Sequence, residues 1–172
     1  MNIQKIVMAA ALLGFSVPVL AHGGSSAGGF WQGIIHPLTG LDHLVAVICL
    51  GAWLSTISRS VALKSVLAVV ALFFSSIVLA GTIEGAQLKL VEASVLASVG
   101  VIGILMLART QLGALTPIVA AALFVVHGLA HSTEVVGGAY SFASGASLSV
   151  AGLALVSYFF AKSVTFFCTK WA

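Results

Sequence analysis

The stretch Gly33-Ile-Ile-His-Pro-Leu-Thr-Gly-Leu-Asp-His43 decides how the rest of the chain is interpreted, because the apolar run Leu44 to Leu54 follows it directly. It places two imidazoles and one carboxylate at the mouth of a predicted membrane helix. On insertion scales a central Asp costs about 2.5 to 3.5 kcal/mol, so ionisable residues within membranes usually face the interior of a bundle and serve a function. The stretch therefore predicts a polar functional site inside an apolar helical protein.

A second polar motif lies well downstream of the first. In His127-Gly-Leu-Ala-His131-Ser-Thr-Glu134 two imidazoles are four residues apart and a carboxylate follows three residues later. This spacing puts the side chains near one face of a helix. Nitrogen donors with a nearby carboxylate suit Ni²⁺, Co²⁺, Zn²⁺ or Cu²⁺ better than Mg²⁺ or Ca²⁺, which prefer all-oxygen ligands. We expect the two motifs to share one metal site, made by His36, Asp42, His43, His127 and His131 with Glu134 close by.

The composition is that of an integral membrane protein. Of the 172 residues 60% are hydrophobic and 6% are charged, and the mean hydropathy is +1.20, whereas soluble domains have about 25% charged residues. The length suits one compact bundle, because each span uses about 20 residues. The sequence has no basic cluster typical of nucleic-acid binding and no P-loop or other nucleotide-binding signature. Cys49 and Cys168 lie in apolar runs and are interpreted as small buried hydrophobes.

Residues 1–21 are predicted to form a cleavable secretory signal peptide. They contain one lysine, an apolar core from Ile6 to Leu20, and the small-residue cleavage pattern Val19-Leu-Ala21 before His22. The mature chain, residues 22–172, would then be a single transmembrane helical bundle domain with a flexible glycine and serine segment at its start. An uncleaved first membrane helix is the alternative interpretation.

The remaining sequence predicts an all-α integral membrane protein, a bundle of five transmembrane helices, or six when a short half-helix before the first is counted. The half-helix covers Phe30 to Ile35 and is expected to end at His36-Pro37, because proline disfavours the α region for the residue before it. A loop is expected at Gly137 to Gly145. The five spans are expected from Thr39 or Asp42 to about Ile57, Val61 to Ala80, Val91 to Ala108, Thr116 to about Thr133, and Ala146 to about Phe167.

The distribution of charge predicts the orientation in the membrane. With the mature N-terminus outside, only Lys89 lies at the outer side, and the inner side carries Arg59, Lys64, Arg109, Lys162 and Lys170. Cytoplasmic loops are enriched in Lys and Arg, so we expect a bacterial inner membrane protein with a periplasmic N-terminus and a cytoplasmic C-terminus. The same topology places all four acids and all five histidines in the outer half.

Three other features allow more than one interpretation. Glu92, at the start of the third span, either hydrogen-bonds a metal ligand, lies on the ion path, or is placed there by the helix dipole alone. His22 would chelate metal through its imidazole and free amine after cleavage, and is otherwise a solvated terminal residue. A stripe of small residues in the third span predicts close helix packing; it consists of Ser94, Ala97, Gly100 and Gly103.

The two polar motifs also have alternatives to metal transport. Histidines can hydrogen-bond across helices as structural contacts, worth about 0.6 kcal/mol each in one measured bundle. The same donors could hold zinc in an intramembrane hydrolase, with a water in the open position and Glu134 or Asp42 as the base. A non-transporting metal sensor or an accessory protein for metalloenzyme assembly is a third possibility. The motifs contain no thiolate, which argues against a dedicated Cu(I) route.

The two motifs and the Val91-Glu92 start of the third span resemble the HupE/UreJ family, over essentially the whole chain. The resemblance implies a signal peptide and a nickel or cobalt permease, associated with hydrogenase, urease or cobalamin maturation; Zn²⁺ stays open as the cargo. It implies no enzyme activity and no prosthetic group, and it favours a role for Glu92. Ser132 stands where the family commonly has a glycine, and the family is often drawn with six spans. We therefore expect a secondary transporter that captures a divalent metal at its outer side.

Overall fold

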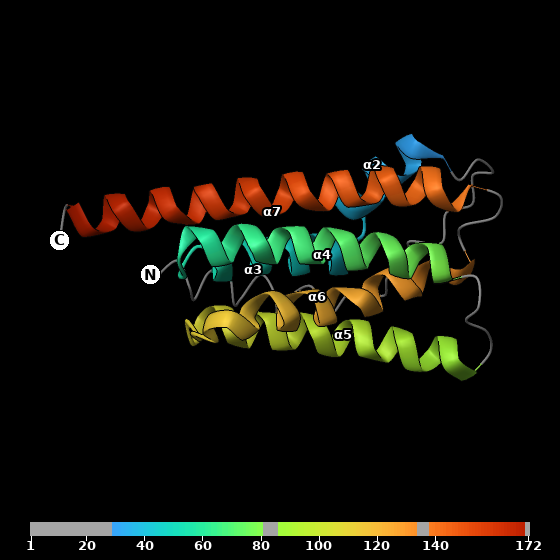
Figure 1. Ribbon diagram of the computed structural model, residues 1–172, viewed down its shortest axis with the longest axis horizontal. Coiled ribbons are helices and arrows are strands. Elements are labelled where there is room, and N and C mark those ends of the chain that lie inside the picture. Colours follow the sequence, from blue (N-terminus) through green and yellow to red (C-terminus); the bar gives the residue numbers. More distant parts are fainter. Residues whose placement is uncertain (1–28, 81–85, 134–137, 171–172) are drawn as a thin grey trace.

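The computed structural model describes residues 29–80, 86–133 and 138–170, which contain helices and no strand. The expected signal peptide, His22, Glu84 and Glu134 lie outside these residues. The elements run side by side in one bundle (Figure 1), which confirms the predicted all-α architecture. In chain order they are α2 (Phe30–Thr39), α3 (Leu41–Leu54), α4 (Arg59–Leu79), α5 (Ala86–Leu107), the 3-10 turn η2 (Gly113–Leu115), α6 (Thr116–Leu129), the 3-10 turn η3 (Ala130–Thr133) and α7 (Ala139–Lys170).

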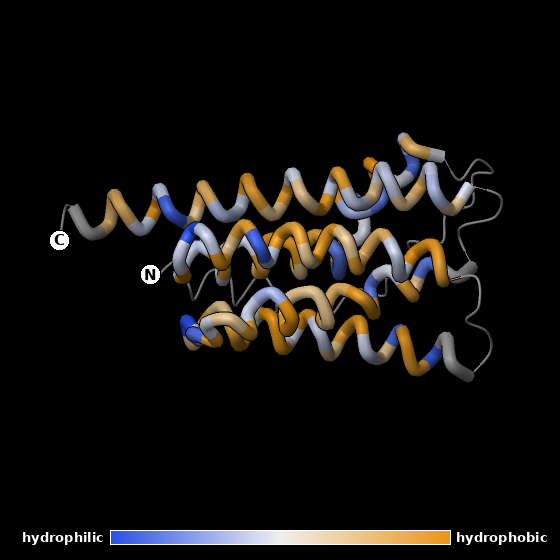
Figure 2. The backbone as a smooth tube through the Cα atoms, viewed as in Figure 1, coloured by the Kyte–Doolittle hydropathy of each residue, from blue (hydrophilic) through white to orange (hydrophobic). Residues whose placement is uncertain are grey.

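Three helical segments are long and apolar enough to cross a membrane: Arg59–Leu79, Lys89–Leu107 and Ala139–Cys168. A fourth candidate span is the bent pair formed by α2 and α3, whose axes differ by 78°. The apolar helix Gly113–Leu129 is shorter. Hydrophobic residues predominate along the helices (Figure 2), as the hydrocarbon core of a bilayer requires. The structure therefore supports three to four spans by length, and the count of five stays a prediction.

The predicted end of the half-helix at His36-Pro37 is wrong by about one turn. Helix α2 continues through Pro37 to Thr39, and the break falls at Gly40. The added turn forms although Pro37 lacks an amide donor, because the carbonyl groups at the helix end still find donors. The amide of Gly40 donates to the His36 carbonyl at 2.9 Å, and the Thr39 hydroxyl donates to the Ile35 carbonyl at 3.2 Å.

The loop predicted at Gly137 to Gly145 is also wrong, because α7 begins at Ala139. Gly145 is a packing residue: an added Cβ would collide with the Phe30 carbonyl of α2. The contact is reciprocal, since a Cβ on Gly33 of α2 would collide with a backbone carbonyl of α7. Glycines at such positions let helix backbones approach closely in membrane bundles. The glycines that suggest a turn in the sequence therefore join α2 to α7.

The small-residue stripe on α5 does not have the packing role predicted for it. Within the described residues, a Cβ on Gly100 or Gly103 would meet no atom within 4 Å. Close helix contacts occur instead at Gly128 and Gly51. A Cβ on Gly128 would collide with the Ser76 side chain of α4, and one on Gly51 would lie 2.5 Å from a carbonyl oxygen of α7. Glycine contacts thus hold α6 to α4 and α3 to α7.

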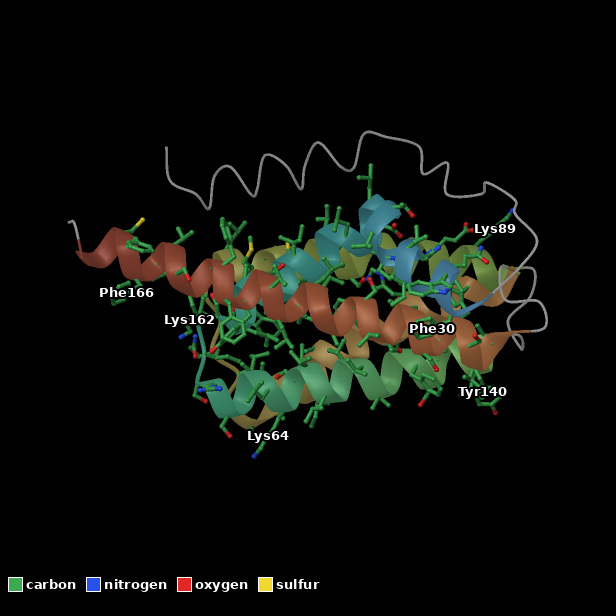
Figure 3. The ribbon with its side chains drawn as sticks, turned by 90° about the horizontal axis from the view of Figure 1, so that it is seen from above. Phe30, Lys64, Lys89, Tyr140, Lys162 and Phe166 are labelled. Carbon is green, nitrogen blue, oxygen red and sulfur yellow. The ribbon has the colours of Figure 1, made fainter. Side chains whose placement is uncertain are left out.

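Basic residues and histidines gather at opposite ends of the bundle. Lys64 and Lys162 lie toward one end, whereas Lys89 lies toward the end that also carries Phe30 (Figure 3). The second end contains the start of α3 and the end of α6, and therefore the histidines of both motifs. The predicted segregation is confirmed for the described residues. Which end faces the cytoplasm stays a prediction.

The close contact between α2 and α7 can be tested by substitution of glycine on one helix. Gly145→Ala is expected to lower the free energy of unfolding by about 1 to 3 kcal/mol, the usual cost of overpacking, because its Cβ would collide with α2. Gly152, also on α7, has open space at the Cβ position, so Gly152→Ala should be neutral or gain up to about 1 kcal/mol from helix propensity. Unfolding in detergent, followed by circular dichroism, measures both. Equal stability of the two variants would contradict direct packing of α2 on α7.

Candidate metal centre

Four histidine rings from the two motifs converge at the bent end of the bundle. His36 lies on α2, His43 in the first turn of α3, His127 near the end of α6, and His131 in η3. The ring centroids of His36 and His131 are 4.4 Å apart. Those of His43 and His127 are 5.0 Å apart, and those of His43 and His131 are 5.2 Å apart. The predicted meeting of the two motifs is confirmed by these distances.

The 78° bend between α2 and α3 assembles the first motif. It brings the His36 and His43 rings to 5.1 Å from each other, although one lies on each helix. The Asp42 Oδ1 and the His43 Nδ1 are 3.0 Å apart. Gly40 lies between the two helices, and a Cβ on it would be 3.3 Å from the Asp42 carboxylate and 3.4 Å from His43 Nδ1. A small residue at the bend therefore leaves room for the carboxylate and the imidazole.

The second motif is held by aromatic contacts and by the packing of α6 on α4. The His127 ring stacks on Phe124, with 5.1 Å between centroids and an interplanar angle of 24°. The His131 ring contacts Phe142 of α7 at 5.3 Å and Phe73 of α4 at 6.3 Å. These rings form apolar walls around the imidazoles. Sequence reasoning misses them, because a Phe in an apolar helix looks the same whether it lines a site or fills a core.

The centre is almost closed to solvent. The exposed fractions of His127, His131 and His43 are 0%, 2% and 5%. Buried polar atoms in folded proteins nearly always have a hydrogen-bond partner. Among the described residues, however, the Nε2 of His43 and the Nδ1 of His127 have none. Each of these two buried nitrogens has a lone pair that a bound cation could accept.

Two overlapping triads of side chains have the spacing of metal ligands. One consists of His36, His43 and His131, and the other of Asp42, His43 and His127. Within each triad the ligand atoms lie within 4.8 Å of one another. Atoms bound to one ion at about 2.0 to 2.1 Å are at most about 4.2 Å apart, so side-chain shifts of under about 1 Å would close either triad. Imidazoles with one carboxylate fit nickel, cobalt or zinc, and do not fit the all-oxygen preference of Mg²⁺ and Ca²⁺.

Ser98 of α5 contacts the centre and is not singled out by the sequence. Its hydroxyl lies 2.8 Å from His127 Nε2 and 2.7 Å from the Val95 carbonyl. A carbonyl can only accept, so the single hydroxyl proton goes to Val95 and the His127 Nε2–H donates to Ser98. The Nδ1 of His127 is then the nitrogen with an available lone pair. Ser98 is one of several small residues on α5, so nothing in the sequence separates it from a packing residue.

Three predicted site residues, Glu92, Glu134 and His22, are not members of the two triads. Glu92 is exposed on α5 and belongs to neither triad. Glu134 and His22 lie outside the residues that the structure describes. Their predicted roles as ligand, ion-path residue or additional chelator stay predictions.

The chain is similar to known proteins over most of its length. A family model described as HupE / UreJ protein matches residues 10–169. A curated relative, Protein HupE of Rhizobium leguminosarum bv. viciae, is 34% identical over 143 residues, which cover 78% of this chain and 70% of the relative. No solved structure matches the chain.

The hydrogen bond from His127 to Ser98 predicts one tautomer of the imidazole. In ¹⁵N NMR spectra of histidine-labelled protein without added metal, His127 should show a protonated Nε2 and an unprotonated Nδ1. Ser98→Ala removes the acceptor and should give a mixture of tautomers, whereas Ser98→Thr keeps the hydroxyl and should preserve the single form. The His127→Gln spectrum assigns the signal. A proton on Nδ1 in the parent protein would refute this hydrogen-bond assignment.

Proposed function

Because the chain belongs to the HupE/UreJ family, we propose that it is a permease that carries a divalent transition metal, nickel or cobalt, across the bacterial inner membrane. The main support is the convergence of four imidazoles and the Asp42 carboxylate in one buried cluster. Histidines that serve only as structural contacts would satisfy one another by hydrogen bonds. Here two buried nitrogens, on His43 and His127, have no such bond among the described residues. A cation would use both lone pairs.

The centre is proposed to open to the periplasm. The cationic residues described by the structure are mainly at the opposite end of the bundle, where Lys64 and Lys162 lie (Figure 3). Cytoplasmic ends of membrane proteins carry the excess of Lys and Arg. The metal would therefore enter beside Asp42, whose side chain is 15% exposed, and leave toward the cytoplasm.

The overlap of the two triads supports a stepwise path for the ion. His43 belongs to both triads, so an ion held by His36, His43 and His131 can exchange its ligands one at a time for Asp42 and His127. The second triad adds a carboxylate, which offsets part of the charge of a divalent cation. Transport requires binding that is strong enough for entry and divided over several sites so that the ion can leave. Two adjacent triads meet this requirement better than one closed tetrahedral site.

The proposed cargo and energy source follow from the chemistry of the chain. The ion is a substrate and not a resident cofactor. The sequence has no nucleotide-binding signature, so uptake would depend on an ion or metal gradient or on partner proteins. The metal would serve hydrogenase, urease or cobalamin maturation.

Metal uptake by proteoliposomes distinguishes a transporter from a hydrolase or an accessory protein with the same ligands. Substitutions then show which residues are needed for uptake. Liposomes with the purified chain should accumulate radioactive nickel or cobalt, and His43→Ala and His131→Ala should abolish uptake, because no nearby group replaces a lost ligand. Cys49→Ala and Cys168→Ala should leave it nearly intact. Glu92→Gln should be impaired but active, because Glu92 belongs to neither triad; the predicted supporting role would cost about 10- to 100-fold when lost.

The outcomes of this experiment have distinct meanings. Metal that is retained by the protein without accumulation inside the liposomes would support an accessory or hydrolytic role instead. Full uptake in both histidine variants, at matched reconstitution, would remove His43 and His131 from the path.

The proposed histidine ligation predicts a dependence on external pH. A metal-bound imidazole must be unprotonated, and an ordinary imidazole titrates at about pH 6.5. Protons and metal compete for the same nitrogens, so the apparent metal affinity should fall as the external pH decreases from about 7.5 to 5.5. Initial uptake rates over a range of metal concentrations at each pH give the affinity. An affinity that does not change over this range would argue against ligation by histidine.

A further inference from the structure

A cavity of about 420 Å³ lies at the other end of the bundle from the histidines. Its walls come from the end of α3, the connection between α5 and α6, and the last part of α7. Every residue that lines it except Phe166 is polar or basic; these are Ser55, Thr56, Arg109, Gln111, Lys162 and Thr165. Helix α3 connects the two sites: it begins beside Asp42 and His43, and about 20 Å farther along, at 1.5 Å per residue, it ends at the cavity.

The charges around this cavity favour an anion. Arg109 and Lys162 each supply a positive charge, and none of the described residues that line the walls is acidic. The acids among the described residues are distant in the fold: Asp42 lies at the far end of α3, and Glu92 lies near the start of α5, whose last residues precede Arg109. The three hydroxyl groups of the walls donate to backbone carbonyls of their own segments, at 2.7 Å from Ser55 and Thr56 and 2.9 Å from Thr165, so the charges of Arg109 and Lys162 carry the attraction. Guanidinium and ammonium groups are the side-chain groups that bind phosphate in proteins.

Hydrogen bonds fix the shape of the cavity before any ligand enters. The Trp53 indole donates to the Thr110 carbonyl at 3.0 Å and so ties the α5–α6 connection to α3. The Gln111 amide donates to the Thr56 carbonyl at 3.3 Å and to the Arg109 carbonyl at 3.1 Å. Arg109 has φ +49, a conformation that few residues other than glycine adopt and that persists only when the surroundings impose it.

The basic groups are also placed at the depth of lipid headgroups. Helix α7 has 32 residues, about 48 Å at 1.5 Å per residue, whereas the hydrocarbon core of a bilayer is about 30 Å thick. Its C-terminal turns extend past the other helices (Figure 1). Lys162 lies on the last part of α7, beside the end of α3, with its ammonium 5.9 Å from the centre of the Tyr158 ring. Phe166 is 62% exposed beside the same cavity and offers an apolar surface for an acyl chain.

We propose that this cavity binds a phosphate group, presented by the headgroup of an anionic phospholipid in the leaflet at this end of the bundle. Basic pockets between membrane helices on the cytoplasmic side bind anionic headgroups in this way. The proposal rests on the placement of the bundle in a membrane and does not depend on metal transport. A free phosphate ion carries the same chemistry, so the experiment includes it as a separate probe.

The test measures dissociation constants of the purified full chain by native mass spectrometry, with phosphatidylglycerol, phosphatidylcholine and inorganic phosphate as probes. The variants are Lys162→Gln and Arg109→Asn; asparagine tolerates the left-handed backbone at this position. The control is Lys64→Gln, which removes an exposed charge at the same end of the bundle, outside the cavity.

We expect phosphatidylglycerol to bind more tightly than phosphatidylcholine. Each cavity variant should weaken its binding about 10-fold, the loss of one hydrogen bond to a charged group, and the control should change it less than about twofold. Equal affinity for the two lipids, or an equal loss in Lys64→Gln, would overturn the proposal. Inorganic phosphate that binds as tightly as phosphatidylglycerol, and less tightly to both cavity variants, would assign the site to a free anion and overturn the lipid. Lys162 is exposed, so its variant remains informative if Arg109→Asn fails to fold.

Discussion

Close contact between helices at glycines is the constraint on which the candidate metal centre depends. Gly33 and Gly145 leave no side chain between α2 and α7, and Gly128 of α6 leaves room for the Ser76 side chain of α4. Each contact lies within a turn or so of an imidazole: Gly33 precedes His36 by one turn, and Gly128 follows His127 directly. Because ligand distances in a metal site tolerate errors of a few tenths of an ångström, a methyl group added at these glycines would displace the ligands as well as the helices.

Enclosure of so many imidazoles is the observation that the proposed cation site would explain. Burial of a polar group without a partner is unfavourable, and in the low dielectric of a membrane protein the cost rises. The Phe124 and Phe142 rings, which contact His127 and His131, exclude the water that would otherwise satisfy the nitrogens. A bundle that needed only stability would use apolar residues here. A divalent ion, as proposed, would satisfy these nitrogens and balance the single carboxylate.

The sequence predicts the chemistry of this centre better than its geometry. Charged residues in an apolar chain have few permissible positions, so the meeting of the two motifs and the segregation of the basic residues follow from topology. Glycine and serine carry an ambiguous signal, because both favour turns and both favour close helix contacts. For that reason the segment before Gly145 is mistaken for a loop, and the stripe on α5 is mistaken for a helix contact. Ser98, which is not part of that stripe, contacts His127 instead. The break at Gly40 and not at Pro37 depends on which carbonyls find donors, and that becomes visible only in three dimensions.

The two ends of the bundle are electrostatically linked, if the proposed path and the proposed lipid site are both correct. A divalent ion that moves from the histidines toward the basic end approaches Arg109 and Lys162. At a separation of about 10 Å and an effective dielectric constant of about 20, its repulsion from a single positive charge is about 3 kcal/mol. That is enough to slow release by more than a hundredfold. A phosphate group bound between the two side chains would cancel most of this barrier, so the anionic lipid would make a positively charged cytoplasmic end compatible with the exit of a cation.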